Sequence, residues 1–285
     1  MTAPTITYGH GFLEDAWATL SDDYTLTAGG STGSFGVSTS QNLYINITTR
    51  VGDAYAENDD DIDISTTLYP TFICRYCTTG SAKAKIVAVF DDASTQTLLT
   101  DTANTDFTVV KATLTTGKTL DHLRFYNTTG TGFTNYDFVL VCKGVFTFPQ
   151  YTRIHYSMTN RYSNVEVASR IGRRKSWSGA NELIVVVDGD LDSQRDGWKR
   201  PVGNTSKTDI LAAQVLDEIH HNADTETFQW FTCDRGQFKA VMEALEYTEG
   251  PEQPFLYAYH VVLSEYLLVK GQTDNYAERL GLATL

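Results

Sequence analysis

The sequence predicts a mainly β protein with two β-sandwich domains, the second of which carries one flanking helix. Short runs that alternate apolar and polar residues recur along the chain, and Gly, Asp, Asn, Ser and Thr separate them. Only one segment, 209–221, spaces its apolar residues near the period of a helix. The length of 285 residues exceeds what one hydrophobic core usually needs, which indicates two domains.

The first half of the chain contains about eight such runs, which is the pattern of a β-sandwich or barrel. Residues 83–90, KAKIVAVF, show the alternation. The polar residues 1–12 are expected to form a short N-terminal arm. Pro149 ends a long stretch without proline, and we place the domain boundary there. The predicted domains are therefore 1–148 and 149–285.

The second half is organised around residues 170–198. Leu183 to Val187 are five consecutive apolar residues, so a strand there has two apolar faces and is predicted to be covered on both sides. One cover is the domain core, and the other is a second sheet, a helix or a neighbouring subunit. Basic residues precede this strand and acidic residues follow it, which suits head-to-tail contacts between identical copies. The predicted subunit-interface residues are Arg173, Arg174, Lys175, Trp177, Asp190, Asp192 and Trp198.

The predicted helix has recognisable ends. Thr208 is a candidate N-cap, and Asn222 would end the helix after two histidines. Residues 237–250 are ambiguous, because their composition favours a helix whereas their alternation favours a strand. We interpret them as a strand, because a turn and another β run flank them.

Charge and composition exclude several classes of function. The net charge of −13 repels nucleic acid, so no sequence-specific nucleic acid partner is expected. No apolar run approaches the roughly 20 residues of a membrane-spanning helix. The N-terminus lacks the basic and apolar regions of a secretory signal, which favours synthesis and use in the cytoplasm or in a particle released by lysis. Four cysteines do not make a disulfide framework and are expected as buried free thiols.

Catalytic motifs give no assignment. Zinc-protease spacing, H-E-x-x-H, is absent, and the Gly-rich residues 29–36 lack the Gly-Lys-Ser/Thr of a phosphate-binding loop. A pair of carboxylates for glycoside hydrolysis needs only proximity in space, and no pair stands out in the sequence. We therefore assign no catalytic residues and expect a protein that is not an enzyme.

The first domain resembles the jelly roll of carbohydrate-binding modules. The resemblance covers about residues 12–148 and rests on an aromatic-Arg strand and on a closing strand with Tyr136-Asp137 ahead of FVLV. It implies a structural calcium held by Asp137 with Glu14 or Asp15. It also implies a sugar-binding face of exposed aromatic residues, although aromatic residues in strands more often belong to the core. The candidates are Trp17, Tyr44, Tyr55 and Tyr126.

The second domain resembles the ring-forming fold of tailed-virus tail proteins. The resemblance covers about residues 150–280 and rests on the order RRKSWSG, ELIVVVDGDL, a helix, ALEYTEG and YAYHVVLSEY. This group includes tail-tube subunits, distal tail proteins and baseplate hub proteins. It implies a structural virion protein, made in the host cytoplasm, that forms a ring of typically six copies and contacts other tail proteins.

Two functions follow from these resemblances. The first is a ring at the distal tail, baseplate or tail tube, whose accessory jelly roll decorates the outside and binds host-surface glycans. The alternative is a lectin-like glycan-binding protein that is not part of a tail. An enzyme such as a glycosidase is disfavoured, because no site for it is recognisable.

Overall fold

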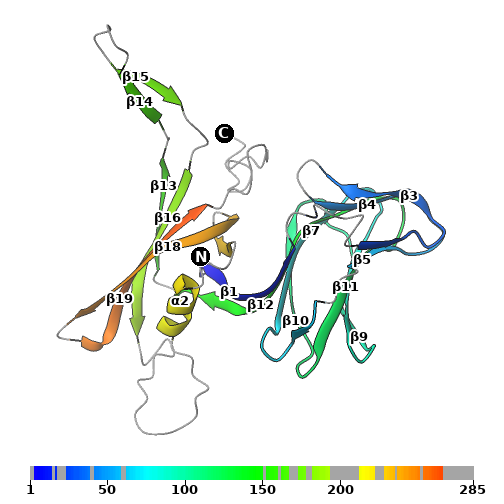
Figure 1. Cartoon of the computed structure of the whole chain (residues 1–285), viewed down its shortest axis with the longest axis horizontal. Helices are drawn as coiled ribbons and strands as arrows, with labels where there is room; N and C mark the ends of the chain where they lie inside the picture. Colours follow the sequence, from blue (N-terminus) through cyan, green and yellow to red (C-terminus); the bar gives the residue numbers. More distant parts are fainter. Residues whose placement is uncertain are drawn as a thin grey trace. The chain divides into compact units, whose positions relative to one another are not determined.

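The structure, a computed structural model, describes residues 3–14, 17, 24–38, 42–58, 62–149, 152–159, 162–166, 173–177, 182–192, 212–221, 228–234, 236–250 and 253–265. In these residues the chain is mainly antiparallel β with one helix, α2 (Ala212–His221), which confirms the predicted fold class (Figure 1). The chain forms two compact units, residues 9–144 and residues 1–8 with 145–285. Residues 1–8 are thus grouped with the second half, whereas the sequence analysis assigned 1–148 to one domain.

The 9–144 unit is a sandwich of two sheets, named here after one strand of each. In the β7 sheet, β12 pairs with β7 and β4, β7 pairs with β10, and β4 pairs with β3. The strands are β3 (Thr32–Val37), β4 (Leu43–Thr49), β7 (Thr71–Thr78), β10 (Thr108–Thr113) and β12 (Gly132–Thr147).

The β11 sheet has the order β2-β5-β11-β8-β9, and β6 also pairs with β11. Its strands are β2 (Tyr24–Thr27), β5 (Ala54–Asn58), β6 (Ile64–Ser65), β8 (Ala84–Phe90), β9 (Thr95–Thr102) and β11 (Thr119–Asn127).

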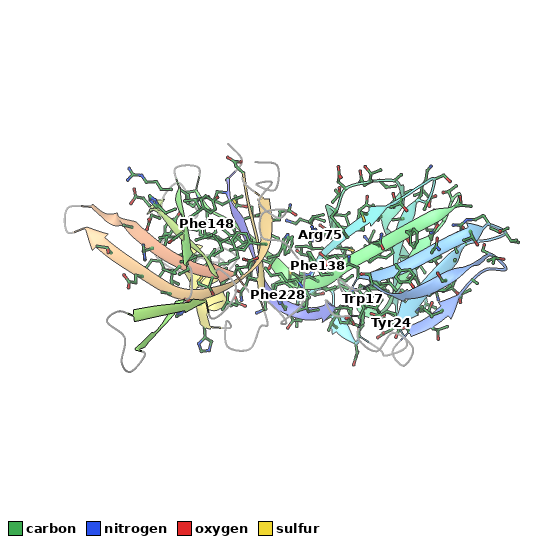
Figure 2. The ribbon with its side chains drawn as sticks, turned by 90° about the horizontal axis from the view of Figure 1, so that it is seen from above. Trp17, Tyr24, Arg75, Phe138, Phe148 and Phe228 are labelled. Atoms are coloured by element: carbon green, nitrogen blue, oxygen red, sulfur yellow. The ribbon has the colours of Figure 1, made fainter. Side chains whose placement is uncertain are left out.

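Strand alternation builds the core between these two sheets. Every second residue of a strand points inward, so the inward residues of both sheets meet and lose their contact with water. At the centre of this core, Phe125 lies 5.4 Å from Trp17 and 5.2 Å from Tyr136, measured between ring centroids. The Trp17 indole also lies 5.5 Å from the Tyr24 ring, and Figure 2 labels both. Large aromatic rings thus supply much of the apolar area that this unit buries.

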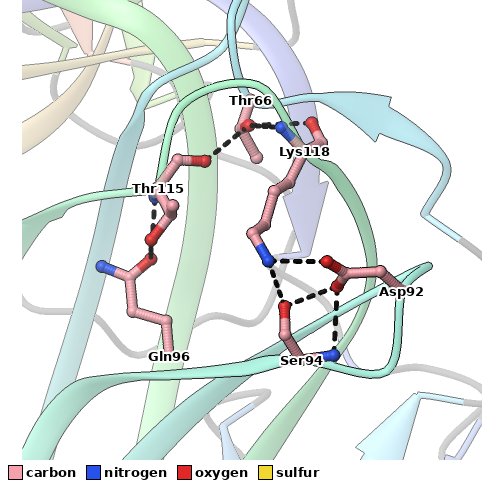
Figure 3. A network of polar contacts seen from close by, with 6 residues as sticks. All are labelled: Thr66, Asp92, Ser94, Gln96, Thr115 and Lys118. Carbon is pink, nitrogen blue, oxygen red and sulfur yellow. Dashed lines mark hydrogen bonds and ion pairs between the residues drawn. The ribbon is translucent and has the colours of Figure 1, made fainter.

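A polar network ties three loops of the same unit together (Figure 3). The Lys118 ammonium forms an ion pair with Asp92 at 2.7 Å and donates a hydrogen bond to the Ser94 hydroxyl. The Thr66 hydroxyl bonds the carbonyls of Thr115 and Lys118, at 2.8 Å each. Hydrogen bonds from Lys118 and Ser94 lower the pKa of the Asp92 carboxyl to about 2. The turn after β8 is therefore fastened to the loop before β11.

The second unit is one antiparallel sheet with a helix and a hairpin. Its strand order is β1-β17-β18-β19-β16-β13, and β14 pairs with β15 in a separate two-stranded sheet. The strands are β1 (Thr5–Glu14), β13 (Arg153–Thr159), β14 (Tyr162–Glu166), β15 (Arg173–Trp177), β16 (Glu182–Asp192), β17 (Gln229–Cys233), β18 (Gly236–Gly250) and β19 (Gln253–Glu265). Helix α2 packs on β18 and buries one apolar face, formed by Val215, Leu216 and Ile219.

Several sequence predictions have a definite outcome in this unit. Residues 237–250 lie in β18, so the interpretation as a strand is confirmed. Helix α2 lies within the predicted segment 209–221, and the candidate cap Thr208 lies outside the described residues. Residues 5–14, where an arm was expected, form β1, because Thr5 pairs with Thr232 of β17. A partner more than 200 residues away has no signature in the local sequence.

The apolar run 183–187 lies in β16 and is covered unequally. Leu183, Val185 and Val187 are fully buried in the core of this unit, as predicted for one face. Ile184 and Val186 on the other face are only half-buried. The expectation of cover on both sides is therefore met on one face of the strand and only in part on the other.

The cysteine prediction is confirmed, because all four thiols are free and buried. Burial also raises the pKa of the Cys74 thiol well above its ordinary value. Among the described residues, no helix is both long and apolar enough to cross a membrane.

Truncating Phe125 tests the aromatic core. We expect Phe125→Ala to lower the free energy of unfolding of the 9–144 unit by about 3–5 kcal/mol, because it removes a ring that is 1% exposed and leaves a cavity. Urea denaturation of the full chain followed by tryptophan fluorescence measures this loss. Leu68→Ala is the control, because Leu68 is 62% exposed and should change stability little. Equal effects of the two substitutions would contradict the packing described.

Removing Lys118 tests the loop network. We expect Lys118→Met to raise the pKa of Asp92 from about 2 toward the ordinary value of about 3.9, because the carboxylate loses its cationic partner. The folded-state pKa is depressed, so the stabilisation by this pair is present above about pH 4 and is lost as the pH falls toward 2. NMR titration of the Asp92 side chain measures the change. Lys111→Met, which removes an exposed lysine elsewhere, should leave it unaltered.

Candidate functional site

The outer face of the β11 sheet gathers aromatic and charged side chains from three strands. On β11, Leu123 and Phe125 point into the core, so Arg124 and Tyr126 point outward. The same alternation on β5 turns Tyr55 and Glu57 outward. In the antiparallel register Tyr126 faces Tyr55, and Arg124 faces Glu57. Pairing therefore places two predicted sugar-contacting residues side by side.

Two cations flank the tyrosine pair. The Tyr55 and Tyr126 rings lie 4.9 Å apart between centroids and are tilted by 38°. The Lys85 ammonium, contributed by β8, lies 5.0 Å from the centroid of the Tyr126 ring. The Arg124 guanidinium lies 5.8 Å from the centroid of the Tyr55 ring. Cations at such distances are attracted to the electron-rich ring face, which favours this ordered arrangement.

Carboxylates fix the positive charges of this face. Glu57 forms an ion pair with Arg124 and also lies 3.5 Å from Nε2 of His122, whose Nδ1 is 2.9 Å from Asp121. Burial lowers the pKa of Arg124, but the hydrogen bond and charge of Glu57 outweigh it, so this pKa is raised. Burial likewise raises the pKa of the Tyr126 phenol, which stays protonated and able to donate a hydrogen bond.

The other two predicted sugar-contacting residues lie elsewhere. Trp17 is 1% exposed, and its indole nitrogen donates a hydrogen bond to the Asp137 carbonyl at 2.9 Å, so it is a core residue and its assignment to the sugar face is corrected. Tyr44 lies on the outer face of the β7 sheet, half-buried beside Phe133. Burial separates Trp17 from Tyr55 and Tyr126, although all of them are aromatic residues in the same half of the chain.

The predicted calcium ligands have protein partners. The Asp137 carboxylate pairs with Arg75 at 2.6 Å, and Glu14 accepts hydrogen bonds from the Trp17 backbone and the Tyr24 hydroxyl. Asp15 lies outside the described residues. The described part of the chain contains no cluster of three His, Cys, Asp or Glu residues that could hold a metal. Arg75 neutralises Asp137 in the way that the resemblance assigned to a calcium ion.

The predicted subunit-interface residues are only partly described. Arg173, Arg174, Lys175 and Trp177 lie on β15, where Arg173 pairs through its backbone with Glu166 of β14; their side chains lie outside the described part. Asp190 is exposed on β16, whereas the side chain of Asp192 and all of Trp198 are not described. The structure therefore places the backbone of this predicted surface and not its charges.

Residues 29–33 read G-x-S-x-G, the spacing of a hydrolase nucleophile, but Ser31 has a structural role. It is buried between β2 and β3, and its hydroxyl donates to the Gly52 carbonyl at 2.8 Å and accepts from the Val51 amide at 2.9 Å. A nucleophile elbow needs a strand followed by a helix, whereas this segment joins two strands. The motif here closes a loop.

Sequence reasoning missed the charged residues of the candidate site. Lys85, Glu57, His122 and Arg124 occupy alternate positions of strands whose other positions are apolar. That alternation marks them as outward-facing, but only the strand pairing shows that they share one face with the two tyrosines.

Comparison with known proteins gives a weak likeness in fold. No family model and no curated protein matches this chain. In the N-terminal half the structure resembles carbohydrate-binding modules, such as the apo CBM1 module of BiXyn10A, at 11% identity and a TM-score of 0.38, over 47% of this chain and 98% of that one. A mutant family 29 module matches at 14% identity and a TM-score of 0.36, over 49% and 93%. A CBM29-2 mutant complexed with cellulohexaose matches at 12% identity and a TM-score of 0.35, over 50% and 93%.

Proposed function

We propose that the 9–144 unit binds a glycan on the outer face of the β11 sheet. The observation that carries the proposal is the tyrosine pair, Tyr55 and Tyr126, with a cation beside each ring. Aromatic rings offer flat apolar surface to the C–H faces of a sugar ring, and their phenols add hydrogen bonds. The ammonium of Lys85 and the guanidinium of Arg124 are donors for sugar hydroxyl oxygens.

The arrangement supports binding without catalysis. Glycoside hydrolysis uses one carboxyl group as an acid and a second as a base or nucleophile. On this face Glu57 is held by Arg124 and His122, and Asp121 is held by His122. These ion pairs stabilise fixed side-chain positions, which reduces the entropy lost when a ligand binds. We therefore propose a binding protein and not an enzyme.

Replacing the tyrosine pair tests the glycan-binding proposal. We expect Tyr55→Ala and Tyr126→Ala each to weaken binding of the full chain at least tenfold, because each removes stacking surface. Isothermal titration with a panel of neutral and acidic hexasaccharides, including cellohexaose and mannohexaose, measures the affinity. Leu68→Ala, which removes an exposed side chain elsewhere in this unit, is the control. A panel in which no glycan binds, or affinities equal in all variants, would sink the proposal.

We also propose that the 145–285 part self-associates, as in the ring of a virion tail. The observation that favours this second function is the outer face of β16 and β19, where Ile184, Val186 and Val262 are half-buried. In the strand register, Ile184 pairs with Ser264 and Val186 with Val262, so these aliphatic groups are neighbours. An aliphatic surface on an open sheet face is stabilised when a second subunit covers it.

A row of alternating charges borders this aliphatic surface. Across β13, β16, β19 and β18 the register aligns Arg153, Asp188, His260 and Glu246. His260 and Asp188 are in contact, with 2.6 Å between Nδ1 and Oδ1. Alternating charges beside an aliphatic surface fix the register of a contact more than they add to its affinity. This pattern supports an ordered assembly of identical copies.

A charge placed in the aliphatic surface tests self-association. We expect Val186→Lys to reduce the molar mass measured by light scattering, because a buried ammonium without a partner destabilises an interface. His221→Lys, which alters an exposed position of α2, should leave the mass unchanged. If the unaltered protein is a monomer at the highest accessible concentration, or if Val186→Lys assembles normally, this surface is not an interface.

A further inference from the structure

The outer face of the β7 sheet carries a second set of aromatic and amide side chains. On β4, Leu43 and Ile45 are fully buried, so Tyr44 and Asn46 point away from the core. On β12, Phe133 and Asn135 point the same way. Because the β7 and β11 sheets share one core between them, this face lies on the opposite side of the sandwich from Tyr55 and Tyr126.

Strand pairing arranges these four residues as a checkerboard. Tyr44 faces Asn135, and Asn46 faces Phe133. Each ring therefore has an amide directly opposite, and the two rings meet on the diagonal with centroids 6.0 Å apart and planes at 60°. Ser34 of β3 faces Asn46 on its other side and adds a hydroxyl to the same row. Rings and hydrogen-bonding groups thus alternate over three adjacent strands.

The rings are placed to present surface to a ligand. Phe133 is 40% exposed, which is unusual for so large an apolar side chain. The Tyr44 ring lies across β3 at Gly36, where a Cβ atom would stand 2.7 Å from the Tyr44 hydroxyl oxygen. Any larger residue at position 36 would push the ring off the sheet. Glycine at this point therefore lets Tyr44 lie along the surface beside Phe133.

The amides on this face have unused hydrogen-bonding capacity. Within the described residues, the side chain of Asn46 makes no hydrogen bond to protein, and that of Asn135 donates only to the sulfur of Cys77, at 3.6 Å. Sulfur is a weak acceptor, so this contact uses little of the capacity of the amide. A free amide offers one carbonyl oxygen and two N–H donors, which match adjacent hydroxyl groups of a sugar.

The two faces of the sandwich differ in charge. The β11 face carries Lys85, Arg124 and Glu57, whereas the checkerboard residues and Ser34 have no ionised group. An uncharged surface of rings, amides and a hydroxyl is complementary to an uncharged polyhydroxyl ligand and gives an anion no partner. We infer that Tyr44, Asn46, Phe133 and Asn135 form a second site, which binds a neutral glycan on the face opposite the tyrosine pair. The unit would then bridge two glycan chains.

A cross-strand aromatic pair also stabilises a sheet without binding anything, so the test must separate binding from stability. The full chain is titrated calorimetrically with the neutral hexasaccharides, as the unaltered protein, as Tyr55→Ala/Tyr126→Ala, as Asn46→Ala/Phe133→Ala, and with all four substitutions. We expect the unaltered protein to bind two equivalents, each double variant to bind one, and the quadruple variant to bind none. Thermal unfolding of every variant verifies the fold, and the site left intact in each double variant is an internal control.

The outcomes separate this inference from the proposed function. Loss of all binding in Tyr55→Ala/Tyr126→Ala, or affinity unaffected by Asn46→Ala/Phe133→Ala in that background, overturns the second site and leaves the first. Binding that survives Tyr55→Ala/Tyr126→Ala and falls at least tenfold only when Asn46 and Phe133 are replaced supports the second site and overturns the first. Light scattering in which Asn46→Ala/Phe133→Ala abolishes self-association, without any effect on glycan binding, assigns the face to protein contact and also overturns the inference.

Discussion

Packing of two sheets against one aromatic core is the constraint on which the 9–144 unit depends. Phe125 stands at its centre, with edge-to-face contact to Trp17 and a tilted contact to Tyr136. Because neighbouring residues of a strand point to opposite faces, burying Phe125 forces Arg124 and Tyr126 outward. A one-residue shift of β11 would bury a guanidinium and expose the core. The outer face of the sheet is therefore set by the same alternation that builds the interior.

Ion pairs then decide what the outer face can do. Glu57 touches both Arg124 and His122, and Asp121 touches His122, so the positive charges on β11 are balanced locally. For the described residues no structural partner of Lys85 other than the Tyr126 ring is seen. Lys85 is thus the cation of this face whose charge is least engaged. The opposite face has rings and amides without charge, so one sandwich presents two chemically different surfaces.

The second unit is organised by unequal burial of its sheet. Val185 and Val187 of β16 are buried in its core, where α2 also contributes Leu216. On the other face Ile184 and Val186 are half-buried next to a row of alternating charges. A sheet whose second face stays apolar without full cover has surface to offer to another molecule. This asymmetry links the apolar run in the sequence to the self-association proposed above.

The sequence by itself determined the mainly β class, the strand at 237–250, the helix near 212–221 and the four buried free thiols, because each depends on local periodicity or composition. Only the tertiary structure decided that residues 5–14 form a strand, since their partner on β17 lies far along the chain. It also decided that Trp17 is a core residue while Tyr55 and Tyr126 share an outer face. All three are aromatic residues of the same half of the chain, and strand register, which sequence pattern does not encode, determines which of them meet water and which of them meet each other.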